Sequence, residues 1–535
     1  MRLWQQPLNP LHHLALSALA AFAPLVLLLV LMGVLRKSSY VSAAWGLVAS
    51  LFIAVAVWGM PFKIAVVSAA FGAVYALWAI MWIVFTALWL YNLCVDTGKF
   101  ELLRRWMGQH ASGDPRIQAI LVGFCFGALL EGVAGFGTPV ALGAFILVGL
   151  GFAAVDAVTV TLISNMAPAA YGAIGIPIVA LAAVTGLPQQ KLSEMSGRQM
   201  PFIAIIIPFY LVWIVAGRRG IKGAWLAAAV GGGSFGASLF IISNTWGPYA
   251  CDIIASMVSI AAITLLLKVW KPSDECPSKK MKFFTPAPTS KLTWQQSVDA
   301  WAPWAILAAI MILWSYFKLF ATGRIKVAVP ALNNAVFITL YHKPYAAIYT
   351  FDPLAAGTAA LLAVLITALI LRVSPGVIAR SGLRTLKQVI FPTLTVCLIV
   401  ALAYLYNYSG MAYTLGAALA TLGAVFPFFS SYLGWIACFM SGSDTASNFL
   451  FGNLQVAAAH QIGINPVLLA STNCVGAAAG KTISPQSIAV GVTTVGLVGR
   501  EGEVLRTTIW HSILLAAIVG LMALAQAYWL KWMVP

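Results

Sequence analysis

The stretch LLEGVAGFGTPVAL (residues 129–142) places a single carboxylate, Glu131, inside an otherwise apolar run. Three glycines and Pro139 follow this acid within eight residues, and both residue types are unfavourable in the interior of a helix. The stretch therefore predicts a helix that breaks in an apolar environment, beside an acid that has no water around it.

The composition of the whole chain is that of a membrane protein. Its 535 residues are 61% hydrophobic and 8% charged, whereas soluble globular proteins carry about 25% charged residues. Apolar runs recur from end to end, each long enough to cross a ~30 Å hydrocarbon core as a helix. They are apolar on all sides, unlike the alternating strands of a membrane barrel. We expect an all-α polytopic membrane protein with about 12–14 transmembrane helices, some of them broken.

The net charge of +17 lies mostly in short loops, among them the basic segments 96–116 and 217–223, the second of which separates spans expected at 199–216 and 224–243. Loops on the cytoplasmic side collect Lys and Arg, so membrane topology explains this charge better than a nucleic-acid partner does. The seven cysteines are scattered and form no disulfide framework or metal-ligand spacing. The chain also has no nucleotide-binding loop or sizeable soluble domain. We expect no enzyme activity, no metal and no other cofactor.

A polar, Lys- and Pro-containing segment at 269–297 divides the chain into two transmembrane halves, 1–268 and 298–535. Each half has a carboxylate in a Gly- or Ser-rich break and an asparagine in a second break: Glu131 with Asn165, and Asp444 with Asn473. Interrupted apolar segments at corresponding positions of two halves are typical of the binding site of a secondary transporter.

Such breaks suit a small polar anion. A helix that restarts inside the membrane presents unpaired N–H groups and the positive end of its dipole. Small residues let a substrate approach the backbone, and hydroxyl and amide groups add hydrogen bonds. The predicted substrate-binding residues are Gly135, Phe136, Gly137, Thr138, Asn165, Ser441, Ser443, Thr445, Asn448, Asn473, Lys481 and Gln486.

Glu131 and Asp444 are the predicted proton-coupling residues. An acid at membrane depth costs about 2.5–3.5 kcal/mol on insertion scales, so it is presumed functional. Each has a structural alternative: Glu131 as an ion-pair partner, and Asp444 as a helix N-cap. Lys481 holds a substrate carboxylate, pairs with a neighbouring acid or extends to the membrane interface. Asp252 lies near the end of a span and is expected to be solvated.

With these residues in view, the sequence resembles the L-lactate permease family, which includes glycolate permeases. The resemblance covers nearly the whole chain and is carried by LWQQPLNPL (3–11), GFCFGALLEGVAGFGTPVA (123–141), SNMAPAAYGAIGIPI (164–178), GRQMPF (197–202), SGSDTASNFLFGNLQ (441–455) and GKTISPQSIAVG (480–491). It implies a proton symporter for short 2-hydroxymonocarboxylates, such as L-lactate, D-lactate or glycolate, in a bacterial inner membrane. It also implies re-entrant hairpins, an inverted two-fold pseudo-repeat and elevator-like movement.

The sequence departs from the family pattern at Thr138 and Thr482, where we expect Ala and Met, and near 214–220 and 243–253. These departures leave the substrate open. A sodium-coupled carboxylate transporter and a cation/proton antiporter of the same superfamily are the alternatives, because Asn and Ser oxygens also suit a sodium site. A homo-oligomer is compatible with the sequence, but no particular residue supports one.

Overall fold

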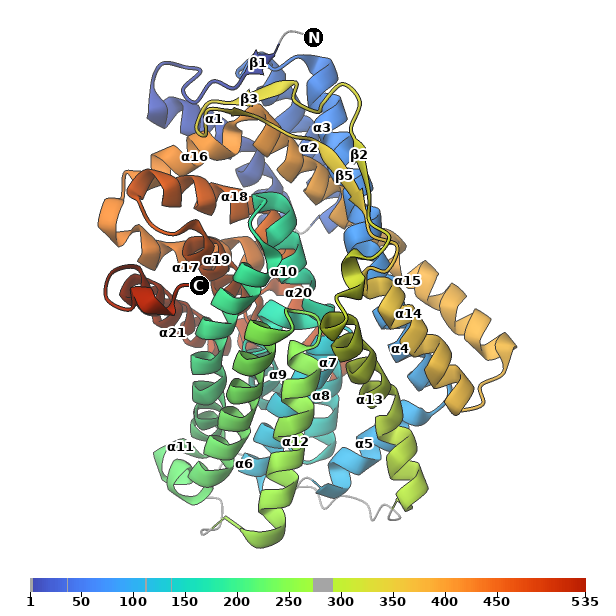
Figure 1. Ribbon diagram of the computed structural model, residues 1–535. Coiled ribbons are helices and arrows are strands. Elements are labelled where there is room, and N and C mark those ends of the chain that lie inside the picture. The colour runs from blue at the N-terminus through green and yellow to red at the C-terminus, as the bar shows by residue number, and fades with distance from the viewer. Residues whose placement is uncertain (1–2, 36, 111–112, 136, 273–291) are drawn as a thin grey trace.

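Long apolar helices form nearly all of the structure, a computed structural model that describes every residue except 1–2, 36, 111–112, 136 and 273–291 (Figure 1). The first half of the chain contains α1 (Leu14–Leu29), α2 (Ser39–Ala56), α3 (Phe62–Ala76), α4 (Trp82–Asp96), α5 (Lys99–His110), α6 (Pro115–Gln118), α7 (Gly127–Val133), α8 (Thr138–Gly149), α9 (Ala154–Ser164), α10 (Gly172–Thr185), α11 (Gln189–Thr245) and α12 (Cys251–Val269). A π-helical segment, Ala119–Phe126, joins α6 to α7.

The second half contains α13 (Trp294–Tyr316), α14 (Ala356–Ile370), α15 (Pro375–Ser409), α16 (Met411–Ala420), α17 (Phe426–Ser441), α18 (Asp444–Ile462), α19 (Pro466–Lys481), α20 (Pro485–Thr494) and α21 (Glu501–Tyr528). In the described part of the chain, five short strands lie outside the helices: β1 (Trp4–Gln5), β2 (Ile325–Ala328), β3 (Val336–Ile338), β4 (Lys343–Pro344) and β5 (Ile348–Phe351). β2 and β5 pair as an antiparallel ribbon, while β3 lies between β1, which is parallel to it, and β4, which is antiparallel.

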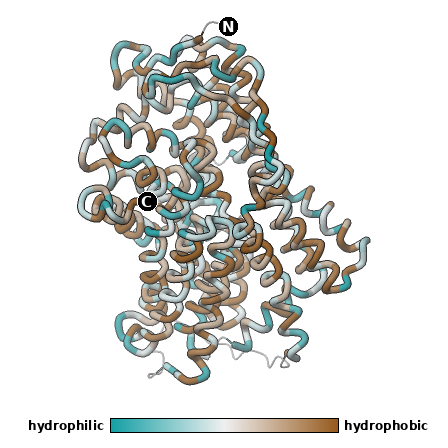
Figure 2. Tube along the Cα trace, in the orientation of Figure 1, coloured by the Kyte–Doolittle hydropathy of each residue, from teal (hydrophilic) through white to brown (hydrophobic). Residues whose placement is uncertain are grey.

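The outer surface of the helices is apolar, as a lipid environment requires. Large side chains such as Phe52, Leu369 and Trp510 are exposed, whereas the amides of Gln455 and Asn473 are fully buried. Along the Cα trace, apolar residues dominate the long helices and hydrophilic residues gather at bends and ends (Figure 2). The fold class predicted from the sequence, an all-α polytopic membrane protein, is confirmed.

Ten helical segments in the described residues are long and apolar enough to cross a membrane, or eleven if the bent pair α9–α10 counts as one span. This number is below the expected 12–14 because several predicted spans are short helices. α8, α9, α10, α19 and α20 have only 10 to 16 residues. A helix needs about 20 residues to cross the hydrocarbon core.

α11 is a helical hairpin rather than one straight helix. Gly217 has φ 66° and ψ −169°, which interrupts the helix and reverses it. A Cβ on Gly232 would lie 2.7 Å from the carbonyl oxygen of Ala204, and one on Gly236 would lie 3.2 Å from that of Pro201. The two arms therefore pack at backbone distance, which small residues permit. The separate spans expected at 199–216 and 224–243 are these arms, and each arm counted separately adds one span.

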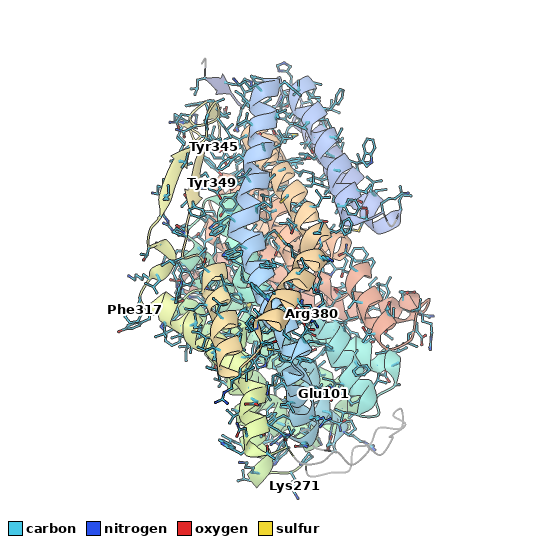
Figure 3. The ribbon with its side chains drawn as sticks, turned by 90° about the vertical axis from the view of Figure 1, so that its right-hand side faces the viewer. Glu101, Lys271, Phe317, Tyr345, Tyr349 and Arg380 are labelled. Carbon is cyan, nitrogen blue, oxygen red and sulfur yellow. The ribbon has the colours of Figure 1, made fainter. Side chains whose placement is uncertain are left out.

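The two ends of the molecule differ in character. Tyr345 and Tyr349, from the segment that carries the strands, lie toward one end, and Glu101 and Lys271 lie at the other (Figure 3). The bend of α11 lies at the same end as α5 and α6 (Figure 1). The described residues of the basic segments 96–116 and 217–223, which the sequence assigns to one side of the membrane, thus share one end of the structure.

Four breaks between short helices are central to the fold of the described residues. They separate α7 from α8, α9 from α10, α17 from α18, and α19 from α20. α9 and α10 are bent by 63° relative to each other. Helices before the polar segment pack against helices after it: α10 on α18, α8 on α20, α9 on α21, and α11 on α19. The breaks of both halves are thus brought into one region.

Candidate functional site

A buried ion cluster joins the two halves. Nζ of Lys481 lies 2.6 Å from Oε1 of Glu131 and 3.6 Å from Oδ2 of Asp444. The three residues are 7%, 2% and 3% exposed, respectively. The three charged residues that the sequence singled out in separate broken segments therefore meet in one place.

Helix ends position all three charges. Lys481 is the last residue of α19 and Asp444 is the first residue of α18. A cation at a helix C-terminus and an anion at an N-terminus both interact favourably with the helix dipole. Glu131 lies two residues before the end of α7. A Cβ on Gly172 would lie 2.4 Å from Oε1 of Glu131. The start of α10 can therefore pack directly against this carboxylate because Gly172 has no side chain.

The ion cluster settles some of the structural alternatives. Lys481 is buried between two acids, so the expectation that it extends to the membrane interface is wrong. The N-cap of α18 is Ser443, whose hydroxyl accepts from the N–H of Ala446 at 3.2 Å. Asp444 therefore does not cap the helix. Its Oδ1 instead accepts a hydrogen bond from Sγ of Cys438 at 3.2 Å.

Asp252 is a third acid in this region, and the expectation that it is solvated is wrong. It lies in the first turn of α12 and is 1% exposed. A Cβ on Gly132 would lie 2.7 Å from Cβ of Asp252, which places α12 directly against the residue next to Glu131. Its position near the start of a predicted span made it look exposed. Tertiary packing, including that against the short helix α7, buries it.

A cavity of about 750 Å³ lies beside the ion cluster. This volume is within the ~300–1,000 Å³ typical of small-molecule sites. Five of the predicted substrate-binding residues line it: Gly137, Ser441, Ser443, Thr445 and Gln486. The wall is continued by residues without a sequence signal, including Lys37, Tyr40, Phe391 and Glu501. Ser443 and Thr445 flank Asp444 in the chain, so the ion cluster lies immediately behind this wall.

Helix N-termini converge on the cavity. Its lining includes Gly137, the N-cap of α8, and Ser443, the N-cap of α18. The first residues of α20, α2 and α21 also line it, through Pro485, Ser39 and Glu501. The N-terminal ends of these helices thus line one volume, and the positive end of a helix dipole favours an anion.

Backbone conformation explains the glycines at two of these turns. Gly137 has φ 81° and Gly442 has φ 69°, a region that side chains with a Cβ rarely adopt. A Cβ on Gly442 would also lie 2.5 Å from Oε1 of Gln486. Both glycines allow a helix to restart at the cavity.

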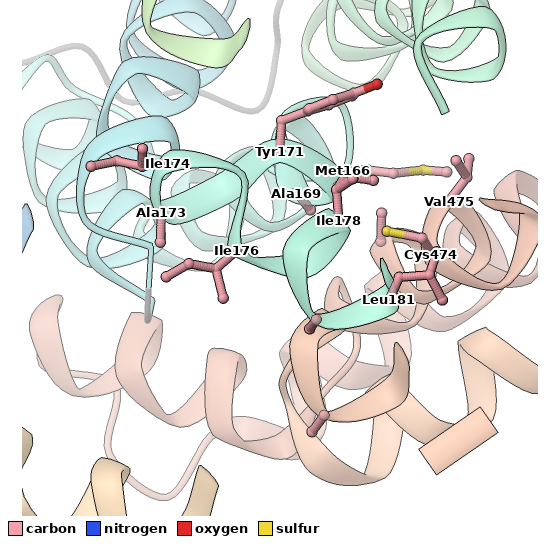
Figure 4. Close-up of a cluster of buried hydrophobic side chains, with 14 of the residues drawn as sticks. Met166, Ala169, Tyr171, Ala173, Ile174, Ile176, Ile178, Leu181, Cys474 and Val475 are labelled. Atoms are coloured by element: carbon pink, nitrogen blue, oxygen red, sulfur yellow. The ribbon is translucent and has the colours of Figure 1, made fainter. Parts of the chain in front are cut away.

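Other predicted binding residues lie away from this cavity. Asn448 and Asn473 hydrogen-bond to each other at 3.0 Å, and Asn448 also donates to the carbonyl of Pro177 at 2.9 Å. They connect α18, α19 and α10 in the interior. In the same region Ile178 and Leu181 of α10 lie beside Cys474 and Val475 of α19 (Figure 4).

Asn165, Thr138 and Gly135 complete the predicted set. Asn165 ends α9, and its buried side-chain amide has no hydrogen-bond partner among the described residues. Thr138 begins α8 and is half-buried. A Cβ on Gly135 would lie 3.7 Å from Oε1 of Glu131, so this glycine belongs to the surroundings of the ion cluster. Phe136 lies outside the described residues.

The comparisons with known proteins agree on one family. The family model of L-lactate permeases matches residues 17–530. The chain is 42% identical to an L-lactate permease of Salmonella typhimurium, with all of both chains covered. It is 40% identical to the glycolate permease GlcA of Escherichia coli, over 98% of each chain. It is 38% identical to an L-lactate permease of Bacillus subtilis, over 99% of this chain and all of that one.

The apolar spans and these bacterial relatives identify a multi-pass protein of the inner membrane, a transporter rather than an enzyme. Four of the six motifs that carried the resemblance (123–141, 164–178, 441–455 and 480–491) contain the helix breaks around the ion cluster and the cavity. The chain belongs to the L-lactate permease family.

Proposed function

We propose that the protein imports short 2-hydroxymonocarboxylates, such as L-lactate, D-lactate or glycolate, by proton symport. The observation that carries this proposal is the cavity on which several helix N-termini converge beside a buried Glu131–Lys481–Asp444 cluster. The cavity supplies an anion site, and the buried acids at and beside the cluster supply a group that exchanges a proton.

The substrate carboxylate is expected at the N-terminus of α18. The hydroxyls of Ser441, Ser443 and Thr445 line the cavity there. A 2-hydroxy acid needs a donor for its carboxylate and a further partner for its hydroxyl, and the amide of Gln486 faces the same volume. The names of the relatives, L-lactate permease and glycolate permease, support this substrate class.

Proton coupling rests on the ion cluster. Two acids against one lysine, with Asp252 buried beside them, leave uncompensated negative charge in the membrane interior, which a proton reduces. Asp444 adjoins two cavity-lining residues, so a charge on the substrate and a charge on this acid act on each other across a low-dielectric wall. Substrate binding therefore favours protonation of one of these buried acids, and the substrate anion and its proton are neutral as a pair.

The test is counterflow in vesicles reconstituted with the purified protein. Vesicles loaded with unlabelled L-lactate are diluted into labelled L-lactate, with glycolate, D-lactate, pyruvate and succinate as competitors. We expect transient accumulation of label that glycolate and D-lactate suppress and succinate does not. Absence of counterflow with every 2-hydroxymonocarboxylate would contradict the proposed substrate class.

The coupling ion is tested separately in the same vesicles. An imposed pH gradient, acid outside, is expected to drive accumulation in sodium-free buffer and to alkalinise the medium. Accumulation that requires a sodium gradient and ignores the pH gradient would show a sodium-coupled transporter. Cation/proton exchange without any carboxylate would show an antiporter.

A further inference from the structure

The buried charges around Glu131 do not balance. Glu131 and Asp444 face the single ammonium of Lys481, and Asp252 lies against the same group of residues. With all three acids ionised, this buried region carries two uncompensated negative charges. Such an excess is strongly unfavourable at membrane depth, so at least one acid is neutral.

Hydrogen-bond donors distinguish the three acids. Glu131 accepts a hydrogen bond from the ammonium of Lys481 at 2.6 Å. Asp444 accepts one from Sγ of Cys438 at 3.2 Å and also lies 3.6 Å from the ammonium of Lys481. Both carboxyl oxygens of Asp252 are buried and have no hydrogen-bond partner among the described residues. A buried carboxylate without donors costs far more than a neutral carboxyl group.

The charged and titratable groups that face Asp252 are few in the described part of the chain. Glu131 faces it from α7, Lys481 from α19 and Cys251 from its own helix. The phenol of Tyr171 lies beyond Cys251 and donates to the carbonyl of Ser193 at 2.6 Å. The ammonium of Lys481 is already engaged by two closer acids, so it compensates a charge on Asp252 only in part.

We propose that Asp252 holds the exchangeable proton of this site, while Glu131 and Asp444 stay ionised against Lys481. The proposal rests on the proposed proton symport and names the atom group that performs it. A proton from water on one side forms the O–H bond of Asp252, and the same bond breaks when the proton leaves to water on the other side. Glu131 and Lys481 then tune this exchange without changing their own protonation.

An isosteric substitution separates Asp252 from its neighbours. Asp252→Asn resembles the protonated acid in shape and charge, so it should fold and bind substrate. Glu131→Gln instead removes a charge that Lys481 needs. In thermal unfolding, D252N is therefore expected to resemble the unchanged protein, whereas E131Q is less stable. If D252N unfolds as early as E131Q, Asp252 is an ionised partner and the proposal is wrong.

Transport by D252N is measured in the vesicles described above. The unchanged protein is expected to lose apparent lactate affinity about tenfold per pH unit at alkaline pH, as one proton binds with each substrate. D252N is expected to show counterflow that no longer depends on pH, and to lose accumulation driven by a pH gradient. Asp299→Asn, which removes a partly exposed partner of Lys99, serves as control and should keep both properties.

The outcomes separate the two proposals. If the unchanged protein gives no counterflow, the proposed function fails regardless of Asp252. If it gives pH-driven uptake and D252N keeps the same proton stoichiometry and pH dependence, the function stands and Asp252 is not the proton site.

Infrared spectroscopy gives a readout without transport. The unchanged protein at neutral pH should show the carbonyl stretch of a buried protonated carboxyl group. This band should disappear in D252N and remain in D299N. A band unaffected by D252N would overturn the assignment, even if the substitution also impaired transport for other reasons.

Discussion

Nζ of Lys481 and Oε1 of Glu131 are 2.6 Å apart, although the residues are separated by 350 positions in the chain. This ion pair connects the end of α19 to the end of α7, and Asp444 at the start of α18 completes it. Three helix breaks from two distant parts of the sequence are therefore held together by charge. The cavity for the proposed anion lies on the other side of the same breaks.

Lys481→Met is expected to destabilise the protein by about 3–5 kcal/mol, because it leaves buried acids without their cation. Thermal unfolding in detergent measures this change. Lys99→Met is the matched control: its pair with Asp299 is partly exposed and contributes about 0–1 kcal/mol. The double variant Lys481→Met with Glu131→Gln should be more stable than Lys481→Met alone. Equal or lower stability of the double variant would mean that the two charges are not coupled.

Gly172→Ala should impair transport because the added methyl group would lie 2.4 Å from Oε1 of Glu131 and displace this carboxylate from Lys481. The initial rate of labelled lactate uptake measures the effect. Gly233→Ala in α11 is the control, since no atom lies within 4 Å of its new methyl group. It should leave transport unchanged and stabilise the helix by about 0.5–1 kcal/mol. Wild-type uptake by Gly172→Ala would show that the position of Glu131 is not critical.

Substitutions of Ser443 separate helix capping from anion binding. Ser443→Ala loses the cap of α18, which costs about 1 kcal/mol. Ser443→Asn and Ser443→Asp both keep a capping side chain. Ser443→Asp also puts a negative charge on the cavity wall, so KM for lactate should rise by at least about tenfold. Similar KM values for the Asn and Asp variants would argue against an anion at this helix N-terminus.

Lys37 and Glu501 line the cavity with opposite charges, so removing each charge should have opposite effects on the rate of lactate uptake. Lys37→Gln should slow lactate uptake at low ionic strength, since a cation at the wall attracts the anion through weakly screened charge. Glu501→Gln should speed it. Added salt should reduce both differences. The rates are compared at limiting substrate concentration, and equal responses to the two substitutions would contradict an anion path along this wall.

Glu101 on α5, outside the spans, predicts a dependence of stability on acid pH. Its hydrogen bond to the Arg104 guanidinium, with Arg105 nearby, holds the pKa of Glu101 below its ordinary value. The resulting stabilisation is present at neutral pH and is lost as the pH falls through the pKa of the folded state. The midpoint temperature of thermal unfolding, measured from neutral to acid pH, should therefore fall less steeply in Glu101→Gln than in the unchanged protein. If the decrease in stability at acid pH is the same in both proteins, other carboxyl groups determine that decrease.

Much of the site was predictable from local sequence. Glu131, Asp444 and Lys481 are charged residues in apolar segments broken by Gly, Ser or Pro, and each of these features is costly unless it is used. The structure brings the three together, and it places Gly137, Ser441, Ser443, Thr445 and Gln486 around one cavity. The pseudo-repeat, the elevator movement and the division into two halves remain predictions.

Other features were not predictable because they depend on distant packing. Asn448 and Asn473 have the chemistry of a binding residue, yet they are satisfied by each other and by Pro177. Asp252 has the sequence position of a solvated residue, yet it is buried against Gly132. The two spans expected around Gly217 are the arms of one hairpin whose glycines lie against the backbone of the facing arm.

The membrane environment, the helical class and the points at which helices break follow from the sequence alone, because they depend on local hydrophobicity and on glycine and proline conformation. Which breaks meet, which acid faces Lys481 and which acid has no donor depend on how the helices pack. Coulombic interactions and burial depend on distance in space, and Lys481 and Glu131 become neighbours only when α19 and α7 are packed together.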